Sequence, residues 1–111
     1  MNDTTELLNE TLLTLNVPVA RLIYTGNAST YFTFQTVISQ PTAFADDDNT
    51  AYIHTFRVDL FTKESYKELL TQTIHVLKSA GFMIDSVYGE NYEEDTGFYH
   101  IPINITFLEE S

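Results

Sequence analysis

The sequence predicts a two-layer α+β fold, in which two helices lie on one face of a mainly antiparallel five-stranded sheet. Three observations predict it. Apolar residues recur at helical spacing in two segments, apolar and polar residues alternate in others, and turn residues separate neighbouring strands closely enough for hairpins. The expected order is one helix, three strands, a second helix and two strands. With 111 residues, the chain is expected to form one domain over residues 1–111.

The first helix is expected over residues 3–15. Asp3 stands where a capping residue belongs, and Glu6 follows three residues later, as in a capping box. The apolar stripe of this helix consists of Leu7, Leu8, Leu12 and Leu15. Because its threonines are mediocre helix formers, the helix needs a sheet to pack against.

The next three strands are expected over residues 17–24, 30–39 and 51–61. Residues 25–29 include Gly26 and Asn27, which suit a turn, so the first two strands are expected to pair as a hairpin. Gln40 and Pro41 are expected to end the second strand. In the third strand Phe56, Val58 and Leu60 alternate with polar residues, as on a half-buried strand.

The main helix is expected to begin after Thr62, which suits an N-cap, with Glu64 in the first turn. Its stripe at helical spacing consists of Tyr66, Leu69, Leu70, Thr73, Ile74 and Leu77. Gly81 stands where a helix commonly ends on a left-handed residue. This is the best-defined element in the sequence.

Two further strands are expected over residues 82–92, with a bend at Gly89, and over residues 98–108. Residues 93–97 connect them as a hairpin. In the last strand the odd-numbered residues from Tyr99 to Phe107 are apolar and form one face. Pro102 has no N–H to donate, which predicts that this strand lies at a sheet edge or carries a bulge.

Composition excludes several function classes. Sixteen acidic and five basic residues give a formal charge of −11, so sequence-specific nucleic-acid binding, which needs Lys and Arg on the phosphates, is not expected. The chain has no cysteine, which excludes disulfides and thiolate metal ligands. It has no apolar run long enough to span a membrane, and its early acidic residues are unlike a secretory signal. A soluble chain made in the cytoplasm is expected.

The residue types of catalytic and metal sites do not form known patterns. His54, His75 and His100 are not spaced four apart on a helix, so no metal site is expected. The chain lacks a Gly-x-Ser-x-Gly nucleophile motif, and its four isolated glycines form no phosphate loop. We therefore expect neither enzymatic activity nor a cofactor.

Acidic and aromatic residues are the remaining features. The two acidic clusters are Asp46, Asp47 and Asp48, and Glu93, Glu94 and Asp95. Both are expected to be solvated turns, with calcium binding as the weaker alternative because the EF-hand pattern is missing. The chain has seven Tyr and eight Phe, which is more aromatic surface than one small core is expected to bury. Aromatic residues serve cores and protein interfaces alike, and both uses stay open here.

Five phrases stand in order along the chain. They are residues 30–35 (TYFTFQ), 43–48 (AFADDD), 58–61 (VDLF), 80–82 (AGF) and 92–100 (YEEDTGFYH). Together they resemble the small tail-completion proteins of long-tailed phages and prophages of Gram-positive bacteria, also described as tail terminators or head–tail joining proteins. The resemblance runs from about residue 17 to residue 108 and includes no catalytic motif.

This resemblance implies a structural virion protein without enzymatic activity or cofactor. Proteins of this kind form a ring, usually a hexamer, at the head-proximal end of the tail tube, which stops tube growth and meets the head connector. Genome DNA passes through the lumen. The implied partners are further copies of the chain, the tail tube protein and the head connector protein, and the location is the virion tail, assembled in the host cytoplasm.

Acidic subunits suit a channel through which DNA slides without binding. We therefore expect an interface or the lumen near Phe44, Asp46, Asp47, Asp48, Glu93, Glu94 and Asp95. The alternative is an acidic adaptor that binds a basic protein through charge complementarity, which predicts acidic groups concentrated on one face.

Overall fold

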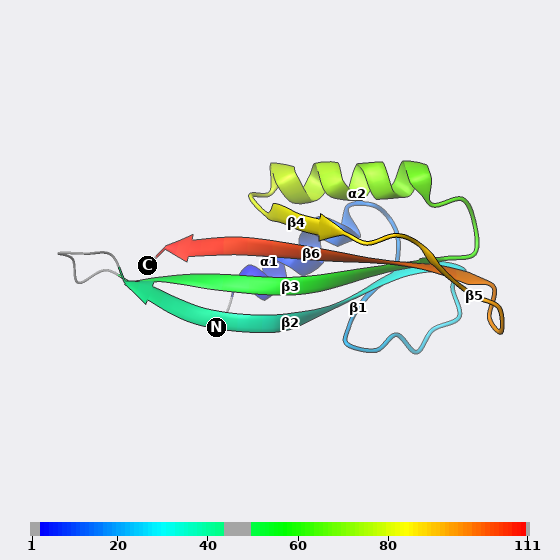
Figure 1. Cartoon of the computed structure of the whole chain (residues 1–111), viewed down its shortest axis with the longest axis horizontal. Coiled ribbons are helices and arrows are strands. Elements are labelled where there is room, and N and C mark those ends of the chain that lie inside the picture. The colour runs from blue at the N-terminus through cyan, green and yellow to red at the C-terminus, as the bar shows by residue number, and fades with distance from the viewer. Residues whose placement is uncertain (1–2, 44–49, 111) are drawn as a thin grey trace.

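The computed structural model describes residues 3–43 and 50–110, and the chain has the α+β fold that the sequence predicts. The elements are α1 (Asp3–Leu13), β1 (Val19–Arg21), β2 (Thr30–Ala43), β3 (Thr50–Thr62), α2 (Lys67–Ser79), β4 (Met83–Val87), β5 (Asn91–Glu93) and β6 (Phe98–Glu110). The strands form one sheet in the order β1-β2-β3-β6-β4, and β5 also pairs with β6. The molecule is elongated, with extents of 54 × 25 × 23 Å, because β2, β3 and β6 run along its long axis (Figure 1).

The hydrophobic core lies between the two helices and one face of the sheet. Its buried members are Leu8, Leu12, Phe32, Phe34, Phe56, Val58, Leu60, Leu77, Phe82, Ile101, Ile103 and Ile105. Strand register places them together: Phe32 lies opposite Leu60, which lies opposite Ile101. Since every second residue of a strand points to the same face, the pattern repeats along the sheet. The alternation predicted for the third and last strands is confirmed.

The two helices differ from their predicted bounds at one end each. α1 ends at Leu13 instead of Leu15, and the side chain of the predicted cap Asp3 lies outside the described part of the structure. α2 begins at Lys67, after Tyr66, which makes no side-chain capping hydrogen bond.

The prediction that Thr62 caps α2 is therefore wrong. β3 continues through Thr62, because pairing with β2 and β6 keeps the chain extended to that point. The Thr62 hydroxyl accepts a hydrogen bond from the Glu64 N–H at 3.1 Å and bonds the Thr30 hydroxyl at 2.8 Å.

The end of α2 is confirmed. Gly81 has φ = +102°, in the left-handed region that glycine adopts readily. Its N–H donates to the Lys78 carbonyl at 3.0 Å, and the Phe82 N–H donates to the Leu77 carbonyl at 2.9 Å. This pair of bonds is a Schellman motif.

The predicted hairpin between the first two strands is wrong. β1 has only three residues and runs parallel to β2, with Val19 opposite Phe32 and Arg21 opposite Phe34. The chain turns immediately after Arg21, where Leu22 has φ = +72° and donates its N–H to the Phe34 carbonyl at 2.9 Å. Residues 22–29 then lead back to the start of β2, so β1 and β2 run in the same direction.

β2 is longer than predicted, because Gln40 and Pro41 do not end it. It pairs with β3 up to Ala43, with a register shift between Thr36 and Ile38. β1 reaches only as far as Phe34 along the other side of β2. Proline is tolerated in an edge strand, where one side makes no ladder bonds, and the far half of β2 is such an edge among the described residues.

The segment predicted as one strand over residues 82–92 is two strands, which raises the count from five to six. β4 and β5 both pair with β6, and the interruption between them contains Gly89. The Tyr88 N–H donates to the Pro102 carbonyl at 2.9 Å, but Pro102 has no N–H to donate in return. The β4–β6 ladder therefore stops there. β6 itself lies between β3 and β4, so of the two predicted alternatives the edge strand is wrong. The ladder of β6 with β4 does have a register shift, which lies between Ile84 and Ser86 of β4.

Candidate assembly surfaces

Of the two acidic clusters expected at an interface or lumen, the structure describes only the second. Phe44 and the aspartates at 46, 47 and 48 fall between β2 and β3, outside the described residues. The adjoining ends of these strands lie at one end of the long axis, and the turn from β5 to β6 lies at the other (Figure 1). The structure therefore does not bring the surroundings of the two clusters together.

The turn from β5 to β6 contains the second acidic cluster. The Glu93 carbonyl accepts the Gly97 N–H at 2.8 Å, and its carboxylate accepts the Thr96 hydroxyl at 3.0 Å. Gly97 has φ = +80°, which closes the turn. Glu94 and Asp95 are exposed, as expected for a solvated turn.

One polar network, centred on the buried His54, joins β2, β3, β6 and α1. His54 is 5% exposed; its Nδ1 lies 2.7 Å from the Ser39 hydroxyl, and its Nε2 lies 2.6 Å from Glu109 Oε1. The Thr4 hydroxyl donates to the same carboxylate oxygen at 3.0 Å. These hydrogen bonds, first that from His54 and then that from Thr4, hold the pKa of Glu109 below its usual value.

The order Ser39, His54, Glu109 is that of a hydrolytic triad, but the surroundings differ. An acyl-transfer site needs its serine in a cavity beside oxyanion donors, whereas Ser39 is exposed on the edge half of β2. The network instead ties the N-terminal end of α1 to the sheet. The sequence does not reveal this network, because its members come from one helix and three strands that are far apart in the chain. Only the register of the strands brings them together.

A second polar group lies on the sheet face away from the core. Asp59 is 8% exposed and accepts a hydrogen bond from Arg57 Nε at 3.1 Å, while His100 Nε2 lies 2.6 Å from the same carboxylate oxygen. His75, the third histidine, is exposed on α2, away from both groups. Among residues 3–43 and 50–110, no three metal-binding side chains are placed to hold an ion.

Aromatic side chains form a row across this same open face. Tyr24 stacks on Tyr31 with ring centroids 4.2 Å apart, Tyr31 on Phe61 at 4.8 Å, and Phe61 on His100 at 4.3 Å. Burial, with Glu93 as the second cause, raises the pKa of Tyr31. The core takes other rings, such as Phe32 and Phe56, so aromatic side chains lie on both faces of the sheet.

The loop before β2 holds the outermost ring of this row. The Tyr24 hydroxyl accepts the Ala28 N–H at 3.1 Å, which closes the loop over residues 24–28. The Tyr24 ring packs directly against Gly26, and a Cβ at that position would clash with it. A side chain at position 26 would therefore displace the Tyr24 ring.

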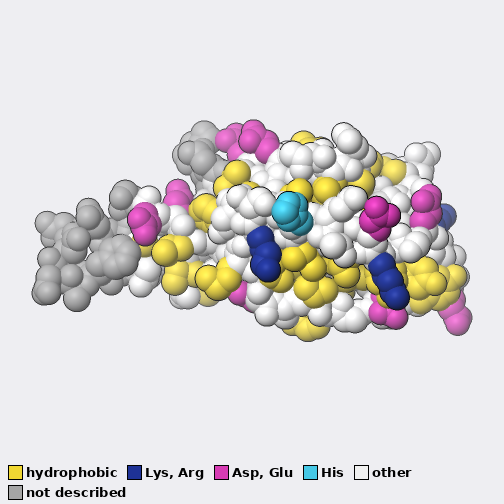
Figure 2. All heavy atoms as spheres, turned by 90° about the horizontal axis from the view of Figure 1, so that it is seen from above, with side chains coloured by type: hydrophobic (Ala, Val, Ile, Leu, Met, Phe, Trp, Pro, Cys, Tyr) yellow, Lys and Arg dark blue, Asp and Glu magenta, His cyan; other side chains and the backbone are white. Residues whose placement is uncertain are grey.

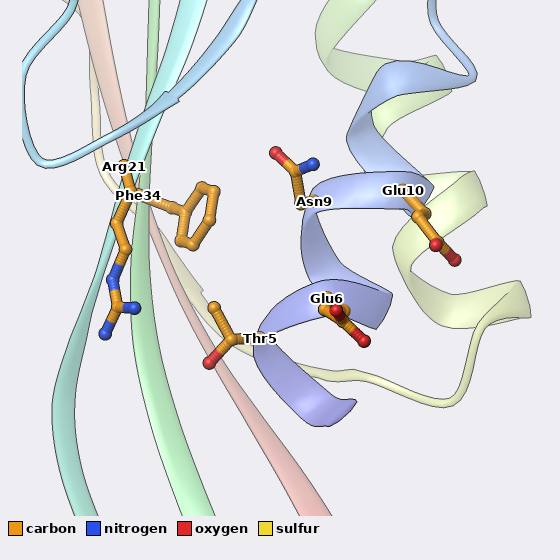
Figure 3. Close-up of a pocket in the computed structure, with 6 residues that line it drawn as sticks. All are labelled: Thr5, Glu6, Asn9, Glu10, Arg21 and Phe34. Carbon is orange, nitrogen blue, oxygen red and sulfur yellow. The ribbon is translucent and has the colours of Figure 1, made fainter. Parts of the chain in front are cut away.

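The hollows of the surface are open. The one in Figure 3, of about 330 Å³, lies between α1 and the strands, with Glu6, Asn9 and Glu10 on the helix and Arg21 and Phe34 on the sheet. The Glu10 side chain points away from Arg21, so charged groups do not converge on one point in it (Figure 3). No described helix is long and apolar enough to cross a membrane.

Acidic side chains are dispersed on the face that Figure 2 shows. They lie among basic, histidine and hydrophobic side chains over the side of the molecule that carries α2, without gathering in one patch. This face therefore gives no support to the adaptor interpretation, which predicts a concentrated acidic patch.

Comparisons with known proteins give one kind of match. No family model matches the chain, and no curated protein matches it. Among solved structures, a chain of a structure titled "Virion of native gene transfer agent (GTA) particle" superposes with a TM-score of 0.56. The match covers 94% of this chain and 92% of that chain, at 12% sequence identity. The likeness is one of fold.

Proposed function

We propose that this chain is a structural protein of a phage-like virion and forms a ring at the head-proximal end of the tail tube. The ring, a hexamer, ends tube growth and joins the tail to the head connector, and genome DNA passes through its lumen without specific binding. The protein acts by shape, and its side chains make or break no covalent bond.

The observation that carries the proposal is the extent of the fold match. It spans nearly all of both chains, so the likeness does not come from one shared hairpin or helix pair. A fold alone does not determine function. The ordered sequence phrases that resemble tail-completion proteins are a separate observation, and they favour the same class of protein.

The surface chemistry also supports a structural role. The described residues offer open hollows, two histidines each paired with a carboxylate, and a row of aromatic rings on the open face of the sheet. Aromatic residues with partly hydrated rings are common at protein interfaces. With a formal charge of −11, each subunit would contribute acidic groups to a channel that repels DNA phosphates.

The described strands that flank the two acidic clusters suggest how the subunit is used. We place Phe44 and the 46–48 aspartates on one docking or lumen surface, and Glu93, Glu94 and Asp95 on another, because the flanking strands lie at opposite ends of the molecule. Opposite ends of an elongated subunit meet different neighbours. The tail tube protein and the head connector protein are the two neighbours that the proposed role requires.

Electron microscopy of particles made without this chain tests the proposal. We expect tail tubes of abnormal length without heads, together with filled heads that lack tails, and restoration of complete particles by the wild-type gene supplied in trans. Complete particles of normal tail length in the deletion would contradict the proposal.

A further inference from the structure

One stretch of the chain carries no charge. Residues 22–45 include no Asp, Glu, Lys or Arg, although charged residues make up 19% of the chain. This stretch of 24 residues includes the loop after β1, the whole of β2 and the two residues that follow it. An uncharged segment of this length within so acidic a chain marks a surface that differs from the rest.

The far half of β2 is also a free sheet edge. β1 pairs with residues 32–34, and beyond Phe34 no described strand pairs with the outer side of β2. Val37 and Ile38 are 56% and 47% exposed there. Proteins usually protect such edges with charged side chains, but here only a bulge and Pro41 interrupt the edge.

We propose that a second copy of this chain docks on the edge of β2 from Gln35 to Ala43 by adding a strand. This inference rests on the ring proposed above and names the surface through which neighbouring subunits of that ring contact one another. Two copies that each carry −11 repel one another over most of their surfaces, and an uncharged edge removes that cost where they touch. A basic partner would instead be drawn to the acidic parts of the chain.

The strand that the neighbour supplies is β4. β2 runs antiparallel to β3, β3 to β6, and β6 to β4, so β4 runs antiparallel to β2. When the next copy keeps the same orientation, its β4 meets β2 as an antiparallel neighbour and the alternation continues from copy to copy. β4 ends the strand order, so no described strand pairs with its outer side, and Met83 is 63% exposed.

This contact is heterologous, because it joins two different edges of the same chain. Such contacts generate a closed ring when the rotation between copies closes. Pairing of β2 with its own copy would stop at a dimer and leave β4 free. The proposal thus makes a specific statement about which edges meet.

Cross-linking tests which edges meet, since the chain has no cysteine of its own. The variant Val37→Cys/Met83→Cys is treated with a bis-maleimide in about 1 M salt, where charges are screened beyond about 3 Å. We expect a ladder of covalent species larger than the dimer. The matched control Val37→Cys/Gln72→Cys, whose second thiol is exposed on α2, should give no such ladder.

Two results would overturn the inference: a ladder no stronger than that of the control, or dimers from Val37→Cys alone, which would mean that β2 pairs with itself. Gln40→Cys/Met83→Cys provides a second pair of exposed positions if the first variant has a lowered melting temperature. The microscopy of deletion particles is an independent readout. If the deletion gives headless tubes but cross-linking gives no ladder, the β2–β4 contact is refuted and the proposed function stands. If the deletion gives normal particles but cross-linking gives a ladder, the proposed function is refuted and the β2–β4 contact stands.

Discussion

The two faces of the sheet carry different kinds of side chain, although neighbouring residues of the same strand supply both. Val58, on the covered face, is fully buried between apolar neighbours, whereas the adjacent Asp59 points to the open face and is bonded by Arg57 and His100. Further along, Leu60 belongs to the core and Phe61 to the stacked row of rings. One strand thus serves both faces by simple alternation.

This difference separates stability from assembly. Burial of apolar groups on the covered face is non-directional and supplies most of the free energy of folding. The hydrogen bonds and stacked rings of the open face each contribute little net free energy, because water competes for the same groups. Changes on the covered face should therefore cost the most stability, changes on the open face should cost less, and changes at the β2 edge should chiefly affect association.

Removal of a large core ring should have the largest effect. Phe56 is fully buried beneath the helices, and Phe56→Ala should lower the free energy of unfolding by about 3–5 kcal/mol, through lost burial and the cavity left behind. Chemical denaturation measures it. Tyr52→Ala, on the same strand and face but exposed, is the control and should cost much less. Equal losses in the two variants would contradict the distinction.

The polar group on the open face should have an intermediate effect. Asp59→Asn keeps the shape but removes the charge that Arg57 and His100 bond, and should cost about 1–3 kcal/mol of unfolding free energy. Asp85→Asn is the control, because that carboxylate is exposed and accepts one bond, from Thr106. If Asp59→Asn lowers the free energy of unfolding as much as Phe56→Ala does, the open face contributes as much to stability as the core, and the distinction is wrong.

The network at Glu109 should give a pH-dependent effect. Its pKa is below its ordinary value of 4.5 in the folded chain, so the carboxylate stabilises the fold above that pH, and the contribution is lost as the pH falls through the lowered pKa. The stability difference between the wild type and Glu109→Gln should thus be largest near neutral pH and shrink under acid. A constant difference over the acid range, in melts at stepped pH, would show that the hydrogen bonds do not perturb this carboxyl.

A charge at the β2 edge should leave stability almost unchanged and abolish association. Ile38→Lys alters an exposed side chain, so the unfolding free energy should change by about 0.5 kcal/mol or less. Light scattering should show a wild-type monomer at low salt that self-associates in high salt, and no association by the variant. Thr71→Lys, exposed on α2, adds the same charge elsewhere and should behave as the wild type does.

The sequence predicts those features whose cause is local. The Schellman end of α2 follows from Gly81 in its position after the apolar stripe, and the faces of β3 and β6 follow from alternation. The direction of β1 does not, because it depends on a turn at Leu22, a residue type that seldom has positive φ. The bend expected at Gly89 falls in the gap between β4 and β5. That the ladder stops opposite Pro102 of β6 could not be predicted from residues 82–92, because it depends on the neighbouring strand.

The candidate surfaces divide in the same way. The acidic clusters are visible as runs of charge, and the solvated turn at residues 93–97 follows from them. The bonds of His54 and His100 to carboxylates join residues 55 and 41 positions apart, and only the register of the sheet makes them neighbours. Likewise, that β2 is an edge depends on how short β1 is, which its own sequence does not reveal.

Neutralisation of the acidic cluster between β2 and β3 should have the smallest effect on the fold and a selective effect on function. The triple variant Asp46→Asn, Asp47→Asn and Asp48→Asn removes three like charges from adjacent positions, so the melting temperature should stay the same or rise slightly. If these residues face the lumen or a docking surface, particles with the variant should join heads to tails or deliver DNA less efficiently, as plaque counts and microscopy measure. The triple variant Glu93→Gln, Glu94→Gln and Asp95→Asn makes the same charge change in the turn from β5 to β6, so a defect of a different kind there would show that the two clusters meet different neighbours. Normal infectivity in both variants would remove the acidic clusters from the assembly surfaces while leaving the β2 edge untouched.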